Sequence, residues 1–144
     1  MTCIYCGNPT KVMNSRKTVR SNETWRRRVC TVCGAVFTTA ETVDFTRTFM
    51  VEEQSGNLVP FLPEKLLISL YDSLRHRSTA ITDAQALHKT VINQIVRVQH
   101  TEPRPGVVQA ATIKRCALRS LQRFDSAAAT HYTAYHPEKS QDRL

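Results

Sequence analysis

Four cysteines lie in two pairs of identical layout near the start of the 144-residue chain. Two residues separate Cys3 from Cys6 and Cys30 from Cys33, a glycine follows each pair, and 23 residues lie between the pairs. Two intervening residues let one tight turn direct both sulfurs to a common point, and glycine permits the backbone that such a turn needs. Two such turns complete a tetrahedral sulfur site that suits Zn2+. The spacing predicts a zinc ribbon in which protein fills every ligand position, so the metal is structural.

Other uses of these cysteines fit the sequence less well. A thioredoxin-like dithiol has one pair in a βαβ context, whereas this chain has two pairs and no such context. Four thiolates also suit an iron–sulfur cluster. The cysteines could also be buried free thiols that bind no metal. Two pairs that are each followed by a glycine favour a metal site over this alternative. Cys116 stands alone at an apolar helical position and is predicted to be part of the core, and all five histidines lie outside the ribbon segment.

Positive charge is concentrated around the cysteines. The formal net charge is +8, and residues 1–47 carry two lysines and six arginines against three acidic residues, or +5 on a third of the chain. This distribution favours a polyanionic partner. No apolar run approaches the 18 or so residues of a membrane helix, and the first residues do not form a signal pattern. We therefore expect a cytoplasmic protein with no membrane partner.

Six residues on two predicted strands are candidate nucleic-acid contacts: Arg16, Lys17, Trp25, Arg26, Arg27 and Arg28. Side chains alternate along a strand, so Arg26 and Arg28 share one face and Arg27 takes the other. Because the sulfurs crowd the zinc side, we expect these arginines to face outward and to contact phosphates. Trp25 either stacks against nucleic acid or fills the small core of the ribbon.

The predicted secondary structure that positions these residues changes near residue 46, from short strands to mostly helices. Residues 1–46 contain three β-compatible runs, at 11–19, 24–30 and 35–42, and such a small segment needs a metal or disulfides to fold. Two short strands follow, in the runs TFMV and LVPF on either side of a polar turn. The fold class is therefore α+β, with a small all-β ribbon followed by a mostly helical domain that contains a short strand pair.

Four helices are predicted in the second domain. The first opens at Pro63, where a missing N–H costs nothing, and the second begins at Thr82, which forms a capping box with Gln85. The third runs from about Val107 to Phe124 and the fourth covers residues 127–135. The tail, 137–144, has nothing to bury and is expected to be mobile.

These motifs together resemble the NrdR-type bacterial repressors of ribonucleotide reductase genes. The matching segments are CIYCGN at 3–8, NSR at 14–16, RRRVCTVCG at 26–34, FTTAE at 37–41 and VPFLPEKL at 59–66, with FDSAAATHYTAYH at 124–136 similar to a family helix. The resemblance implies a DNA-binding zinc ribbon at 1–46 and a regulatory, oligomerising ATP-cone at 47–136. It also implies a nucleoid-associated homo-oligomer on paired operator boxes in double-stranded DNA, controlled by ATP and dATP.

The nucleotide motif departs from the family pattern V-x-K-R-D-G. In the aligned stretch from Val51 to Gly56, Glu53 takes the lysine position and Gln54 the arginine position. Replacing a cation by a carboxylate beside a triphosphate turns attraction into repulsion, roughly 1 to 4 kcal/mol each way. Val51 and Gly56 remain candidate nucleotide contacts, together with Lys65 and His131. We expect altered or weakened binding; the alternatives are other cations at the phosphates and a cone kept only for oligomerisation.

Catalysis is not expected, because the sequence has no triad, no nucleophile with a base and no open metal position. Two other functions compete with that of a repressor. One is a zinc-ribbon module that docks on RNA polymerase or ribosomal RNA and carries a degenerate cone. The other is a subunit of ribonucleotide reductase, for which the chain is far too short.

Overall fold

The computed structural model describes residues 1–19 and 22–137, which divide into two compact units. The first unit is Met1–Asp44 and the second begins at Phe45, two residues before the predicted domain boundary between 46 and 47. The predicted mobile tail lies outside the described residues, apart from Pro137. Among the residues described, no helix is both long enough and apolar enough to cross a membrane.

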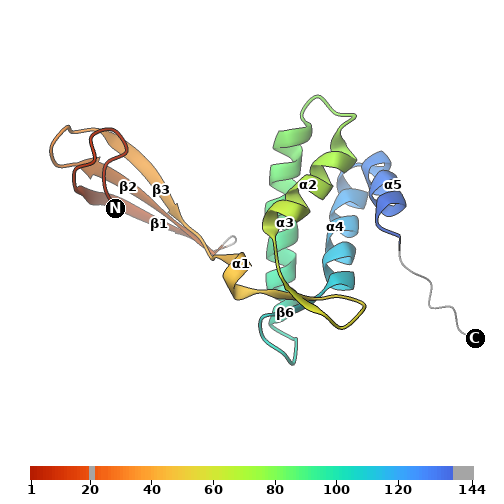
Figure 1. Ribbon diagram of the computed structural model, residues 1–144. Helices are drawn as coiled ribbons and strands as arrows, with labels where there is room; N and C mark the ends of the chain where they lie inside the picture. Colours follow the sequence, from red (N-terminus) through yellow and green to blue (C-terminus); the bar gives the residue numbers. More distant parts are fainter. Residues whose placement is uncertain (20–21, 138–144) are drawn as a thin grey trace, which may run out of the picture. The chain divides into compact units, whose positions relative to one another are not determined.

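The first unit is built on one antiparallel sheet of three strands in the order β1-β2-β3 (Figure 1). The strands are β1 (Thr10–Thr18), β2 (Glu23–Cys30) and β3 (Val36–Glu41), within about one residue of the predicted runs. Of the residues that the structure describes in this unit, only Cys3 and Cys30 are buried. With so little apolar burial, the unit depends on a metal or another cross-link for its stability.

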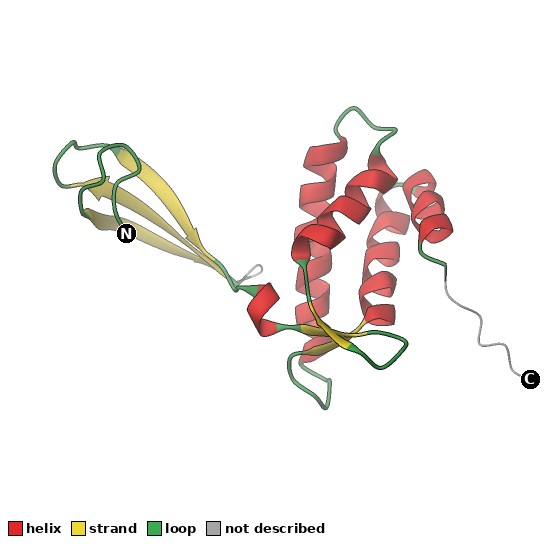
Figure 2. Cartoon of the chain, viewed as in Figure 1, coloured by secondary structure: helices red, strands yellow, loops and turns green. Residues whose placement is uncertain are grey.

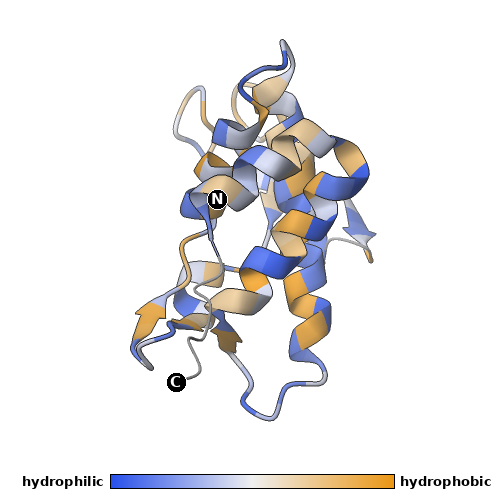
Figure 3. Ribbon diagram, turned by 90° about the vertical axis from the view of Figure 1, so that its right-hand side faces the viewer, coloured by the Kyte–Doolittle hydropathy of each residue, from blue (hydrophilic) through white to orange (hydrophobic). Residues whose placement is uncertain are grey.

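The second unit is mostly helical, as predicted, and Figure 2 distinguishes its helices from its short strands. Its elements are α1 (Phe45–Thr48), β4 (Met50–Glu52), β5 (Leu58–Pro60), α2 (Pro63–Leu74), α3 (Ala80–Gln99), β6 (Val107–Gln109), α4 (Ala110–Phe124) and α5 (Ser126–Tyr135). The α+β fold class is therefore confirmed. Hydrophobic and hydrophilic residues are interspersed along these helices (Figure 3), as expected for helices that bury one face.

The predicted strand pair is in fact a three-stranded sheet in the order β5-β4-β6. Residues 107–109, predicted as the start of a helix, instead form β6, which pairs in parallel with β4. Gly106 precedes them with φ +80°, and its carbonyl accepts a hydrogen bond from the Met50 amide at 2.8 Å. Val108 is 1% exposed. The periodicity of so short an apolar run fits a strand and a helix equally well. Pairing with β4 therefore determines that residues 107–109 form a strand.

The prediction that the second helix starts at Thr82 is also wrong, because α3 begins at Ala80 with Thr79 at its N-cap position. The Thr79 hydroxyl donates a hydrogen bond to Asp83 Oδ2 at 2.6 Å instead of capping a backbone amide. Asp83 also accepts from Arg77 Nε at 2.8 Å, so Arg77 and Thr79 of the preceding loop hold the first turn through Asp83.

The hydrophobic core of the second unit lies between the helices. Leu70 and Leu74 of α2, Val91 and Ile95 of α3 and Leu121 of α4 are each no more than 1% exposed. Cys116 belongs to the same core, as predicted, and burial raises the pKa of its thiol.

Candidate metal centre and nucleic-acid surface

The four paired cysteines converge at one end of the ribbon sheet. The Sγ atoms of Cys3 and Cys33 are 3.7 Å apart, those of Cys6 and Cys30 are 3.4 Å apart, and all four lie within 4.8 Å of one another. Sulfurs at the corners of a tetrahedron, each about 2.3 Å from a central Zn2+, are separated by about 3.8 Å. The observed spacing and the all-sulfur donor set therefore fit one tetrahedral Zn2+.

Two similar turns bring the sulfurs together. Gly7 and Gly34, which follow the two pairs, both have φ +71°, a left-handed conformation that costs glycine little. An added Cβ would meet nothing within 4 Å at either position, so the requirement is one of backbone conformation and not of space. The Tyr5 amide donates to Cys3 Sγ and the Val32 amide to Cys30 Sγ, each at 3.4 Å.

Hydrogen bonds adjust the charge on the sulfurs. Asn8, through its side chain and its backbone, lowers the pKa of Cys6 to about 6, and the amides of Cys33 and Val32 lower the pKa of Cys30. The Ala35 amide favours the Cys33 thiolate, but the neighbouring sulfurs of Cys6 and Cys30 outweigh it and raise the pKa of Cys33 to about 12. Four thiolates so close together repel one another, and a bound divalent cation offsets that repulsion. Metal binding therefore displaces the protons that remain on the cysteines.

The predicted alternation of the three arginines agrees with the sheet register. Arg27 lies opposite Asn14 and Thr38, whereas Arg26 lies opposite Ser15 and Thr39, so the two arginines take opposite faces. The expectation that all three face outward is wrong for Arg26 and Arg28. Both are half-buried, because alternation puts them on the same side of β2 as buried Cys30. Only Arg27 is exposed.

Side chains of β3 engage the two half-buried arginines. Arg26 Nη2 forms an ion pair with Glu41 Oε2 at 2.6 Å, and its Nε is buried without a hydrogen-bond partner. Arg28 Nε donates to Thr39 Oγ1 at 3.2 Å.

Trp25 does not fill a ribbon core, since 42% of it is exposed. Its indole N–H donates to Glu23 Oε2 at 3.3 Å, which leaves the ring on the same face as Arg27. The alternative that treated Trp25 as core is therefore wrong, and a role in stacking stays a prediction.

Comparison with known proteins assigns the chain to a family. A family model described as "Transcriptional repressor NrdR-like, N-terminal domain" matches residues 1–41. The transcriptional repressor NrdR of Azorhizobium caulinodans is 32% identical over 137 residues, which cover 94% of this chain and 76% of the relative. NrdR of Rhodospirillum centenum is 34% identical over 139 residues, which cover 96% of this chain and 86% of the relative.

The chain belongs to the NrdR family of transcriptional repressors.

Membership confirms the resemblance seen in the sequence. NrdR proteins are regulators and not enzymes, in agreement with the absence of predicted catalytic residues. A repressor family implies DNA binding, and the family's zinc ribbon together with the four-cysteine cluster supports a structural Zn2+.

The candidate nucleotide residues of this NrdR-family chain lie at three places in the second unit. Gly56 lies in the turn between β4 and β5, where a cavity of about 290 Å³ is also lined by Glu52, Glu53, Gln54 and the start of α4. Val51 lies in β4 and packs against the core. Lys65 and His131 line a different cavity, of about 450 Å³, between α2 and α5.

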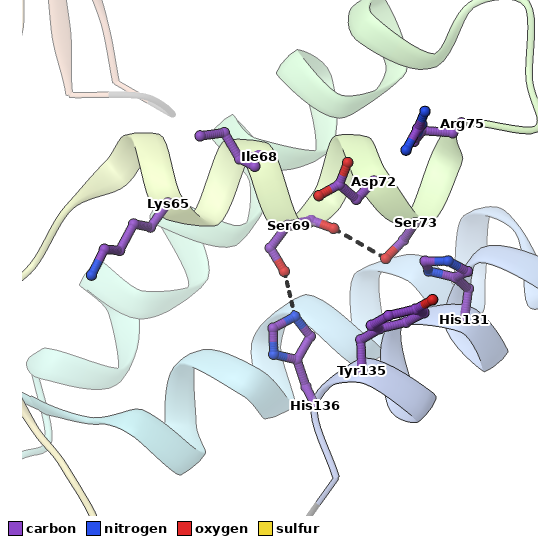
Figure 4. Close-up of a pocket in the computed structure, with 9 residues that line it drawn as sticks. All are labelled: Lys65, Ile68, Ser69, Asp72, Ser73, Arg75, His131, Tyr135 and His136. Atoms are coloured by element: carbon purple, nitrogen blue, oxygen red, sulfur yellow. Dashed lines mark hydrogen bonds between the residues drawn. The ribbon is translucent and has the colours of Figure 1, made fainter.

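The cavity between α2 and α5 has cationic and aromatic groups on its walls (Figure 4). The rings of His131 and Tyr135 stack with centroids 4.5 Å apart, and Lys65 and Arg75 lie toward its two ends. Ser69 Oγ and His136 Nε2 share a hydrogen bond at 2.6 Å. Sequence reasoning missed the other lining residues, although Ser69, Asp72 and Ser73 form a polar i, i+3, i+4 pattern on α2 that could have indicated a lined face.

Proposed function

We propose that this NrdR-family chain represses ribonucleotide reductase genes by binding paired operator boxes as a homo-oligomer. The observation that carries the proposal is a four-cysteine cluster set beside a basic sheet, in a chain whose NrdR relatives align with 94% or more of its length. One ribbon offers few base contacts, so specificity requires paired ribbons on half-sites at a fixed helical spacing.

In this proposal Cys3, Cys6, Cys30 and Cys33 hold the structural Zn2+. The bound metal supplies the cross-link that a sheet with almost no buried apolar residues needs in order to fold. DNA contacts are drawn from the basic residues of β1 and β2, through charge-assisted hydrogen bonds to phosphates.

Adenine nucleotides would control the oligomer through a modified site. The lining of the cavity at the Gly56 turn includes the carboxylates of Glu52 and Glu53 and, among the described residues, no cationic side chain. Arg104 pairs with Glu52 at 2.6 Å and offsets the charge of that carboxylate, so the negative charge that opposes a triphosphate at the turn is that of Glu53. This arrangement disfavours a triphosphate at the turn, whereas the cavity between α2 and α5 offers the cations of Lys65 and Arg75 and the ring of His131, beside the Asp72 carboxylate.

A DNA titration across salt concentrations tests the repressor function. The zinc-loaded full chain is titrated by fluorescence anisotropy against a duplex from a ribonucleotide reductase promoter and a shuffled duplex of equal length, with and without ATP or dATP. Both affinities should fall steeply with salt, while the promoter duplex keeps an advantage of about 10³-fold or more. Equal affinity for the two duplexes under every nucleotide condition would contradict the proposal.

A second candidate is an interaction module that docks on RNA polymerase or ribosomal RNA. It is favoured by exposed apolar residues at the tips of the two cysteine turns, where Ile4, Tyr5 and Val32 are 69%, 67% and 68% exposed. Such side chains are compatible with a protein contact. In the same titration, this function predicts no preference for the promoter duplex.

A further inference from the structure

We propose that the ribbon docks on double-stranded DNA through one face of its sheet, the face on which Arg16, Trp25 and Arg27 lie together and on which, among the described residues, neither arginine forms an ion pair. We call this the open face, and we call the opposite face, which carries Arg26, Arg28 and Cys30, the zinc face. The inference rests on the DNA-binding function proposed above and narrows it to particular side chains.

The strand register defines the two faces. Residues directly opposite each other in an antiparallel sheet share a face, and the partner of Trp25 on β1 is Arg16. Arg27 is two residues from Trp25 on the same strand and therefore lies on the same side. The register is continuous from Arg16 to Asn14, so Asn14 lies opposite Arg27 on the open face, and the register shift begins only beyond Asn14, toward Val12. By the same pairing Lys17 lies opposite Thr24, on the zinc face.

The cations of the open face are available to a ligand. Arg16 and Arg27 are exposed, and within the part of the chain that the structure describes neither guanidinium takes part in an ion pair or hydrogen bond. The cross-strand neighbours of Arg27 are Asn14 and Thr38, which are exposed, uncharged and able to donate hydrogen bonds to phosphate oxygens.

The cations in the middle of the zinc face are already engaged within the sheet. Glu41 pairs with Arg26 at 2.6 Å, Thr39 accepts from Arg28 at 3.2 Å, and both arginines are half-buried. A phosphate that approached this face would meet the Glu41 carboxylate, which is 68% exposed, beside the Arg26 guanidinium. Like charges at that position oppose phosphate binding.

The cations of the open face lie on two adjacent strands, β1 and β2, of the three-stranded sheet. Several DNA-binding proteins read DNA with strands of a sheet. Arg16 on β1 and Arg27 on β2 are diagonal neighbours, with side chains about 7–8 Å apart at their base, so they can reach different phosphates. The exposed ring of Trp25 lies beside Arg16, where it can pack against sugar or base.

Two matched pairs of variants test the face assignment in the zinc-loaded full chain. Arg27→Ala is compared with Arg28→Ala on β2, and Arg16→Ala with Lys17→Ala on β1. The readout is the slope of log affinity against log salt for the promoter duplex and the shuffled duplex. Each open-face variant should weaken binding to both duplexes and reduce the magnitude of the slope by about 0.9, the loss of one phosphate contact. Each zinc-face variant should change the slope by less than half as much.

Zinc content and the circular-dichroism signal of the sheet verify folding. If Arg28→Ala loses zinc, the comparison of Arg16→Ala with Lys17→Ala decides, since the zinc clamp requires neither side chain. A slope change for Lys17→Ala or folded Arg28→Ala as large as that of its open-face partner would overturn the face assignment and leave the DNA-binding function intact. If the unmodified chain binds neither duplex, both proposals fall.

Discussion

Replacing Cys30 by serine should unfold the ribbon while leaving the helical unit folded. Cys30 is 2% exposed, and with Cys3 it accounts for all the buried residues described in the first unit. Ordering a residue costs about 1–2 kcal/mol of backbone entropy, so two buried side chains, at about 1.5–3 kcal/mol each, cannot hold three strands. The metal must supply the difference. Structural Zn2+ sites contribute about 10–16 kcal/mol in small zinc domains, which is enough to decide between folded and unfolded states.

The assay is zinc stoichiometry, measured by a chelating dye after gel filtration, together with circular dichroism. Cys30→Ser should bind far less than one zinc per chain, lose the strand signal and keep the helical signal, because the second unit has its own core. Cys116→Ser is the matched control. That cysteine is 7% exposed in the helical core, so its replacement should leave the zinc content unchanged. A Cys30→Ser protein that retained stoichiometric zinc and the strand signal would refute the clamp.

Two further predictions concern the helical unit. Asp125 accepts from the Ala128 amide at 3.0 Å and pairs with His76 and Arg77, and these contacts lower its pKa to about 2. Since the folded pKa lies below the unfolded value, its contribution is present above about pH 4 and is lost as pH falls toward 2. Asp125→Ala should therefore destabilise the unit by about 0.5–2 kcal/mol in neutral urea melts, and the difference from the unmodified chain should shrink in acid. Glu53→Lys should raise the affinity for ATP in calorimetric titration, because it replaces a repulsive charge at the Gly56 turn; unchanged affinity would indicate that the nucleotide does not use this turn.

Local chemistry made the zinc clamp predictable from sequence. The residues between paired cysteines and the glycines after them are neighbours along the chain, so their geometry follows from short-range backbone preferences. Pro63 likewise placed the start of α2 correctly, because its fixed φ and missing N–H suit a first helical position. Alternation along β2 also predicted that Arg27 and Arg26 point in opposite directions.

Tertiary structure decided which of those directions is open. Glu41 and Thr39 reach Arg26 and Arg28 only because β3 pairs with β2 in one register, and a shift of one residue would reverse the two faces. In the same way, the run at 107–109 became a strand because β4, more than 50 residues earlier, accepts it as a parallel partner. Pairing between distant segments depends on which edges meet in the folded chain, and periodicity within one segment carries no information about that partner.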